Sequence, residues 1–321
     1  MSFSVITKDE LARVTGPKKC CQLSELAALI KMDGSIHIAG RMMAVTVVTE
    51  NAGVARKVLT LFKKLFGLRS EVMVQRKVRL KKNNVYLVRI PPRPEVKQAL
   101  VKLGMWDKES NLPSTKILPS MLTKICCRRS YLRGVFLGGG SISNPEGTYH
   151  LELISTDAEH AKEISEIMQN MGLEAKISTR KNWYVVYLKE SDQIGECLSI
   201  MGAHTALLDF ENVRIYKGMR NKVNRLVNCE TANLNKTINA AMRQQENIRY
   251  IAAIIGLDKL PPVLKETAEL RIAHPDISLK ELGEMMNPPV GKSGINHRMR
   301  KLDKIANDLR KKGKVRFAGK P

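Results

Sequence analysis

The chain has 321 residues, of which 43% are hydrophobic and 26% are charged, and its formal net charge is +23. This composition excludes an intrinsically disordered chain and, because no run of about 18 apolar residues occurs, a helical membrane protein. We therefore expect a cytoplasmic protein of two or three domains that has no membrane partner.

The positive charge is spread over the whole chain. Residues 1–210 hold 31 basic and 20 acidic residues, and residues 211–321 hold 23 and 11. Two cationic parts favour a polyanionic partner, most simply nucleic acid, over the alternative that the charge serves only solubility.

The first predicted element is a short helix over residues 8–14 within an N-terminal lead-in of residues 1–20. Thr7 and Glu10 have the spacing of a capping box at its start.

An internal repeat follows this lead-in. Residues 26–36 read LAALIKMDGSI and residues 132–142 read LRGVFLGGGSI, an offset of 106 residues. The correspondence continues beyond the motif and shifts only at a longer basic hairpin in the first copy. This collinear duplication predicts two tandem copies of one folding unit, residues 21–106 and residues 107–205.

Each copy is predicted to have the element order αββαββα. The motif helices cover about residues 22–32 and 129–138, and alternation of Met43, Val45 and Val47 predicts a strand. Caps at Asn51 and Asp157 begin the second helices, which end at Gly67 and Gly172. The second strand pairs are expected at 71–80 with 84–90 and at 174–180 with 183–189, before short helices that end near Gly104 and Gly202.

The cysteines include two adjacent pairs, Cys20-Cys21 and Cys126-Cys127, which are also 106 residues apart. An adjacent pair lacks the two-residue spacer with which a CxxC motif binds zinc. We therefore expect a structural role beside the motif helices rather than a metal site, and we expect no cofactor.

The remaining chain is predicted to be helical. An asparagine-rich tract, residues 206–235, reads as a helical linker, and residues 236–312 read as an all-α domain. Helices are expected at 236–255 and at 262–273. A third helix is expected to begin at a capping box formed by Ser278 and Glu281, and the last helix is expected at 293–312. Short helices, a proline turn and a basic final helix are typical of a helix-turn-helix domain. Residues 313–321 are expected to be a disordered basic tail.

The last helix carries the first set of candidate DNA contacts. Its apolar stripe leaves six side chains off the core face, Lys292, Ser293, Asn296, His297, Arg300 and Lys304, and Arg298 and Lys301 are further candidate contacts. Asn and Arg side chains can pair with adenine and guanine edges, whereas Arg298, Lys301 and Lys304 suit phosphates. His297 fits a base contact, a phosphate contact or a merely exposed position. Membrane binding is disfavoured, because the helix lacks exposed bulky apolar residues.

The hairpins of the two repeats carry a second set of candidate DNA contacts. These cations are Arg76, Lys77, Arg79, Lys81 and Lys82 in the first copy and Arg180 and Lys181 in the second. Phosphate contact is one interpretation. The other is a solvated edge that uses charge to prevent pairing between sheets.

The repeated motif resembles a known signature. LAALIKMDG, residues 26–34, is similar to the LAGLIDADG signature of homing endonucleases. The resemblance implies that two motif helices pack together at small residues such as Ala27, Ala28, Gly134 and Gly138. It also implies that an acid near the end of each helix binds a divalent cation.

The second acid is missing from this chain. Asp33 fills the acid position of the first copy, but Gly139 fills that of the second. Metal-assisted hydrolysis of a phosphodiester needs anionic oxygen ligands for its cations. We therefore expect a vestigial site without nuclease activity or bound metal. Asp33 is then a helix-end residue, with residual metal binding as the alternative.

Taken whole, the chain is similar to the WhiA family, notably at residues 49–56, 79–90, 126–143, 210–237 and 291–306. The resemblance implies a duplicated LAGLIDADG homing-endonuclease-like body of α+β class, followed by a helix-turn-helix domain. It implies a transcriptional regulator of sporulation, or of cell division and chromosome segregation, that binds double-stranded DNA at the bacterial nucleoid.

Further expectations concern partners and alternatives. Another transcription factor or RNA polymerase is a candidate second partner, and the internal pseudo-symmetry makes a monomer sufficient. One alternative is an active endonuclease. The other is a body that docks a protein while the C-terminal domain alone binds DNA.

Overall fold

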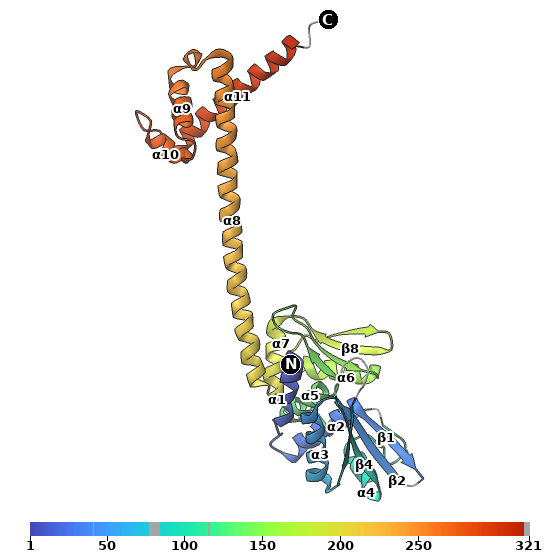
Figure 1. The fold of residues 1–321 in the computed structure, drawn as a ribbon. Coiled ribbons are helices and arrows are strands. Elements are labelled where there is room, and N and C mark those ends of the chain that lie inside the picture. The colour runs from blue at the N-terminus through green and yellow to red at the C-terminus, as the bar shows by residue number, and fades with distance from the viewer. Residues whose placement is uncertain (41, 77–83, 115, 318–321) are drawn as a thin grey trace. The chain divides into compact units, whose positions relative to one another are not determined.

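The computed structural model describes residues 1–321 except 41, 77–83, 115 and 318–321, and it leaves out the side chains of 39 and 313–317. The chain forms two compact units, Met1–Gly218 and Met219–Pro321, here named the duplicated unit and the helical unit. Figure 1 shows the elements of both.

The duplicated unit contains two copies of one arrangement, preceded by α1 (Phe3–Arg13). The first copy consists of α2 (Lys19–Asp33), β1 (Gly34–Ala39), β2 (Met42–Thr49), α3 (Ala52–Phe66), β3 (Glu71–Arg76), β4 (Asn84–Arg93) and α4 (Pro94–Lys102). The second consists of α5 (Ile125–Gly139), β5 (Gly140–Ile142), β6 (Leu151–Ser155), α6 (Ala158–Gln169), β7 (Lys176–Arg180), β8 (Trp183–Leu188) and α7 (Ser191–Met201), after the short turn η1 (Pro119–Met121). Each copy is αββαββα, which confirms the predicted duplication.

The two sheets have the same topology. Both are four-stranded and antiparallel, with strand orders β1-β2-β4-β3 and β5-β6-β8-β7. One face of each sheet packs on helices through residues such as Val45, Val47, Leu151 and Leu153, which are fully buried. The alternation that predicted the strands therefore reflects one packed face and one open face.

Local signals fix the helices that follow the first strand pairs. The side chain of Asn51 accepts a 3.0 Å hydrogen bond from the Val54 amide, and Asp157 accepts a 3.0 Å bond from the Glu159 amide. Gly67 ends α3 with a left-handed φ of 68°, which only glycine adopts without strain. These predicted caps are confirmed.

The motif helices α2 and α5 lie side by side at the centre of the duplicated unit, between the two sheets (Figure 1). Leu26, Ala28, Leu132, Val135 and Phe136 on these helices are almost completely buried in one continuous core. This pairing joins the two copies into one body.

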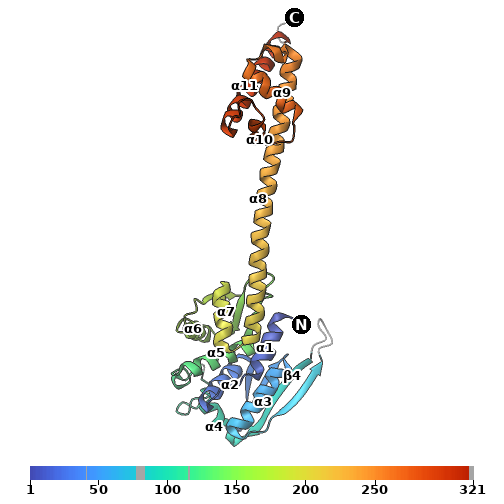
Figure 2. The ribbon, with the colours of Figure 1, turned by 90° about the vertical axis from the view of Figure 1, so that its left-hand side faces the viewer.

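The helical unit packs α9 (Pro262–Ala273), α10 (Leu279–Glu284) and α11 (Lys292–Phe317) around the C-terminal end of α8 (His204–Ile255), after the turn η2 (Leu257–Lys259) (Figure 2). Its core joins Ile248 and Ile251 of α8 to Leu282, Met299 and Leu302. The predicted capping box is present: Glu281 N donates to Ser278 Oγ at 3.3 Å, and Ser278 N donates to Glu281 Oε2 at 2.7 Å.

Two element predictions are corrected by the structure, and two predicted helical segments prove to be continuous. The first helix begins at Phe3 with Ser2 as its cap, and Thr7 instead donates to the Phe3 carbonyl at 2.9 Å inside the helix. The predicted linker of 206–235 and helix of 236–255 are one helix, α8, since no proline interrupts the tract. The last helix continues beyond 312 to Phe317. Among the described residues, no helix is both long and apolar enough to span a membrane.

Candidate nucleic-acid interface

A tight turn sets α11 against α10 in the helical unit. The Val290 amide donates to the Gly283 carbonyl at 2.9 Å, and a β-carbon at Gly283 would lie only 1.9 Å from the Val290 carbonyl oxygen. Any larger residue at this glycine would push the two helices apart. The geometry is that of a helix-turn-helix, in which the second helix presents its outer face to the major groove.

The buried stripe of α11 determines which side chains face outward. Ile295, Met299, Leu302 and Ala306 are each at most 1% exposed. Of the predicted contact residues, six are exposed: Lys292, Ser293, His297, Arg300, Lys301 and Lys304. The structure thus leaves five potential cationic or base-reading side chains and a serine accessible on α11, and these six exposed residues are here called the α11 face.

Two predicted contacts on α11 are held within the fold. Asn296 and Arg298 are half-buried, and Arg298 Nη1 donates to Thr267 Oγ1 on α9 at 3.4 Å. Asp303, between two lysines of α11, accepts a 2.7 Å hydrogen bond from Asn247 of α8. These contacts, which the apolar stripe alone did not indicate, fix the rotation of α11 about its axis.

The hairpin cations of the duplicated unit are only partly described. Arg76 is exposed at the end of β3, whereas Lys77, Arg79, Lys81 and Lys82 lie outside the described residues. Arg180 ends β7 with its guanidinium 3.6 Å from the Glu152 carboxylate, and Lys181 is exposed in the turn with a φ of 52°. The open face of the second sheet is therefore mixed in charge rather than uniformly basic, because Glu152 partly neutralises Arg180.

The two motif acid positions lie at the ends of α2 and α5, beside a pocket of about 330 Å³. Its lining includes Asp33, Gly138, Gly139, Ser155 and Trp183. A β-carbon at Gly139 would lie 2.3 Å from Met32 Cε and 2.6 Å from the Ile154 carbonyl oxygen. Met32 and the β6 backbone thus occupy the space in which a second carboxylate would have to begin.

The carboxylate of Asp33 interacts electrostatically with the ammonium group of Lys8. Burial raises the pKa of Asp33 to about 6, and the positive charge of Lys8 opposes that rise. Lys8 also donates to the Gly138 carbonyl at 3.4 Å. Lys8 belongs to α1, outside both repeats, and no sequence signal linked it to the motif. Among the described residues, no cluster of three metal-ligating groups includes Asp33.

Replacing Asp33 by asparagine should stabilise the duplicated unit near pH 7.5 by about 1–2 kcal/mol, after allowance for partial exposure. The folded-state pKa lies above the ordinary value of 3.8, so the folded protein binds this proton more tightly than the unfolded chain. The resulting stabilisation is complete below about pH 4 and is lost as the pH rises through 6. Denaturant unfolding of both proteins near pH 5 and pH 7.5 measures the effect. An equal gain at both pH values would contradict it.

Family models match three consecutive parts of the chain. A model described as the WhiA N-terminal LAGLIDADG-like domain matches residues 19–106, and the WhiA LAGLIDADG-like domain matches residues 128–220. The WhiA C-terminal HTH domain matches residues 223–306. The first range nearly coincides with the predicted first repeat, and the other two overlap the predicted second repeat and helix-turn-helix domain with different bounds.

Similar proteins extend over nearly the full chain. A protein of Desulforamulus reducens named probable cell division protein WhiA is 61% identical over 311 residues, 97% of each chain. A protein of the same name from Heliobacterium modesticaldum is 56% identical, covering 98% of this chain and 99% of the relative. The solved structure of full-length DUF199/WhiA from "Thermatoga maritima" is 26% identical with a TM-score of 0.59, covering 96% of this chain and 99% of that one.

These findings confirm the predicted fold class, a duplicated αββαββα LAGLIDADG-like body followed by an all-α helix-turn-helix domain. Such domains fit a DNA-binding regulator. The chain belongs to the WhiA family.

Proposed function

We propose that this protein is a sequence-specific transcriptional regulator that binds double-stranded DNA through the α11 face. The observation that carries the proposal is the exposure of Arg300, Lys301 and Lys304 on the second helix of a helix-turn-helix. Relatives named probable cell division proteins support target genes for cell division. Genes for chromosome segregation and for sporulation are further target classes that we propose. DNA binding would hold the protein at the nucleoid.

The side chains of the α11 face suit different contacts. The guanidinium of Arg300 can pair with both acceptors of a guanine edge, which discriminates between bases. Lys301 and Lys304 suit phosphate oxygens, which set position and affinity but carry no sequence information. Ser293 and Lys292 lie in the first turn of α11, where the helix N-terminus also favours a phosphate.

We further propose that the duplicated unit does not cut DNA. Hydrolysis by metal-bound water needs carboxylates to hold the cations, and this chain has Asp33 in one motif position and Gly139 in the other. The crowding around Gly139 and the Lys8 ammonium beside Asp33 support this view. The duplicated unit then contributes affinity, or contacts to a protein such as another transcription factor or RNA polymerase.

Arg300→Ala should weaken binding to a mapped target site by about 1–3 kcal/mol, roughly 5- to 150-fold, and relax specificity at one base pair. Lys304→Ala should weaken binding to all sequences alike and lower the salt slope by about one. Target sites come from genome-wide mapping, and affinities from anisotropy at several salt concentrations. Lys259→Ala, an exposed lysine in η2, is the matched control. Wild-type affinity in both α11 variants would contradict the assignment.

The role of the duplicated unit can be tested in the full chain. Incubation with supercoiled plasmid and Mg²⁺ or Mn²⁺ should leave the plasmid intact, and nicking that Asp33→Ala abolishes would instead establish an endonuclease. Lys181→Ala and Arg76→Ala should weaken DNA binding at low salt if these hairpins contact phosphates. Unchanged affinity would favour a unit that docks a protein.

A further inference from the structure

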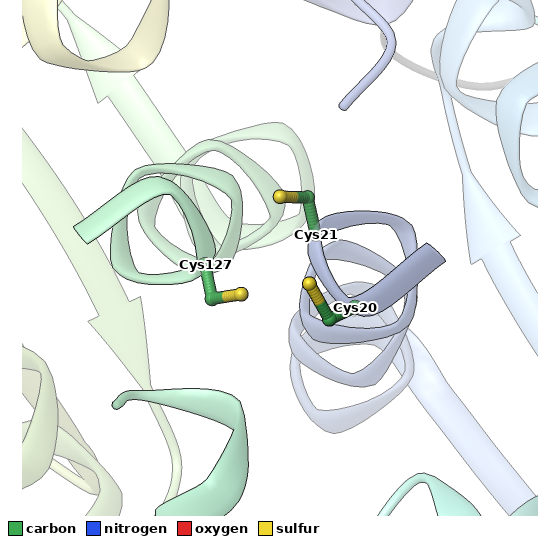
Figure 3. A group of neighbouring side chains, drawn as sticks. All are labelled: Cys20, Cys21 and Cys127. Carbon is green, nitrogen blue, oxygen red and sulfur yellow. The ribbon is translucent and has the colours of Figure 1, made fainter. Parts of the chain in front are cut away.

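Three thiols meet, with a fourth beside them, at the end of the motif helix pair that lies away from Asp33. Cys20 and Cys21 are in the first turn of α2, and Cys126 and Cys127 are in the first turn of α5. The sulfur atoms of Cys20, Cys21 and Cys127 all lie within 4.8 Å of one another. Figure 3 shows these three side chains with their sulfur atoms directed toward one another across the two helix ends. Cys126 neighbours Cys127 in the first turn of α5 but is not one of these three mutually close sulfur atoms.

The packing of the helices explains this meeting. A β-carbon at Gly134 would lie 2.8 Å from Cβ of Ala28, and one at Gly138 would lie 2.5 Å from Cβ of Met32. Corresponding positions of α2 and α5 are therefore in close contact along their length, which shows that the helices run parallel. Residues of the first turn then meet at one end, about 20 Å from the motif acids at the other.

The thiols are sheltered but remain accessible. Cys21 and Cys127 are at most 1% exposed, whereas Cys20 and Cys126 are half-buried, and all four are free. These buried sulfur atoms thus form the inner wall of the group, and the half-buried ones provide a path from solvent.

Positive charge surrounds the group. Both helices begin here, and neither N-cap residue, Lys18 or Lys124, caps its helix with a side-chain hydrogen bond. The side chains of Lys18 and Lys124 carry further positive charge at this end of the helices. Helix N-termini and lysines favour thiolates. These positive charges would also offset the net negative charge of the complex that a divalent cation forms with three or four thiolates.

We propose that Cys20, Cys21 and Cys127 bind one thiophilic divalent cation of the zinc class, with Cys126 as the fourth ligand. Tetrahedral zinc with bonds of about 2.3 Å to sulfur needs sulfur atoms about 3.8 Å apart. The three sulfur atoms lie within 4.8 Å of one another, so each pair has to approach by at most about 1 Å to reach that separation. Bound zinc has no redox chemistry and would join α2 to α5, which makes the site structural.

The missing spacer between adjacent cysteines argues against a zinc site only when each helix is considered by itself. Adjacent cysteines on a helix point in different directions, so a single pair cannot enclose an ion. Here the second copy supplies the opposing thiols. The duplication itself therefore builds the site, because the same pair occurs at the same position of both helices.

The test uses the full chain, stripped of metal and kept reduced, with Zn²⁺ and with Co²⁺ as a coloured probe. We expect one ion per chain, a cobalt spectrum with thiolate-to-metal charge transfer and tetrahedral d–d bands, and a higher melting temperature with Zn²⁺. Cys127→Ser and Cys20→Ser should each weaken Co²⁺ binding by roughly tenfold or more. Cys229→Ser, which changes an exposed cysteine of α8, should bind as wild type does.

Several outcomes would overturn the proposal. One is the absence of stoichiometric binding by the reduced protein, including the case in which the thiols only form disulfides between α2 and α5. Another is a cobalt spectrum that survives Cys20→Ser and Cys127→Ser or disappears equally in Cys229→Ser. Because Cys127 is buried, melting of each metal-free variant is measured first, and Cys20→Ser decides the matter if Cys127→Ser does not fold.

Discussion

Glu25→Gln should destabilise the duplicated unit by about 3–5 kcal/mol, because it leaves two buried cations without their counter-charge. Glu25 is fully buried in α2. Its carboxylate accepts two 2.9 Å hydrogen bonds from Arg133 of α5 and forms an ion pair with Lys57 of α3. Denaturant unfolding followed by circular dichroism measures the loss.

The other bonds of this network explain why the loss should be large. Lys57 donates to the carbonyls of Leu11 and Val14 at 2.8 and 2.6 Å, and Arg133 donates to the Met201 carbonyl at 3.1 Å. Both cations are therefore anchored and cannot swing out to water when the acid is removed.

The pH dependence and a surface pair provide controls. Burial lowers the pKa of Lys57, and Glu25 opposes that shift. In the variant Lys57 should lose its proton more easily, so the deficit should shrink at alkaline pH. Glu159→Gln removes an exposed partner of Lys162 and should change stability little. A deficit no greater than that of Glu159→Gln would refute the assigned role of Glu25.

Gly134→Ala should destabilise the duplicated unit by about 1–3 kcal/mol, although alanine favours a helix over glycine by about 1 kcal/mol. The new β-carbon would lie 2.5 Å from the Glu25 carbonyl oxygen and 2.8 Å from Cβ of Ala28. Both obstacles belong to the facing helix, so α2 and α5 must separate and the core between them must loosen. The shift of the unfolding midpoint measures the loss.

Gly218→Ala in α8 is the matched control, since a β-carbon there meets no atom within 4 Å. The same substitution in an open helical position should stabilise by about 0.5–1 kcal/mol. Opposite signs for the two variants are expected. A gain at both positions would mean that the motif helices are not in close contact at Gly134.

Much of the fold could be predicted from the sequence because its signals are local or repeated. Asn51, Asp157 and Gly67 mark helix ends through their own backbone and nearest turn, and the structure confirms them. The prediction that Thr7 caps the first helix was wrong, because a threonine hydroxyl can donate to a carbonyl one turn earlier as readily as it can cap a helix. The linker and the segment after it were both predicted to be helical, and the structure shows them as one continuous helix.

Part of the candidate nucleic-acid interface could also be predicted, because its signal is local to one helix. The apolar stripe of α11 indicated which side chains face outward, and six of the eight predicted contacts are exposed. Arg298 is held by Thr267 and Arg180 by Glu152, and neither partner is near in sequence. Their roles in DNA binding stay predictions, as does the catalytic inactivity at Asp33.

The sequence by itself determined the duplication, the element order and the outward face of the last helix, since these follow from periodicity and from copies of one pattern. Only the tertiary structure decided what those elements bring together. It joined Glu25 to Lys57 and Arg133, Asp33 to Lys8, and the cysteines of one repeat to those of the other. The physical reason is that charge pairing, close packing and ligand clusters depend on distances between residues that are far apart along the chain.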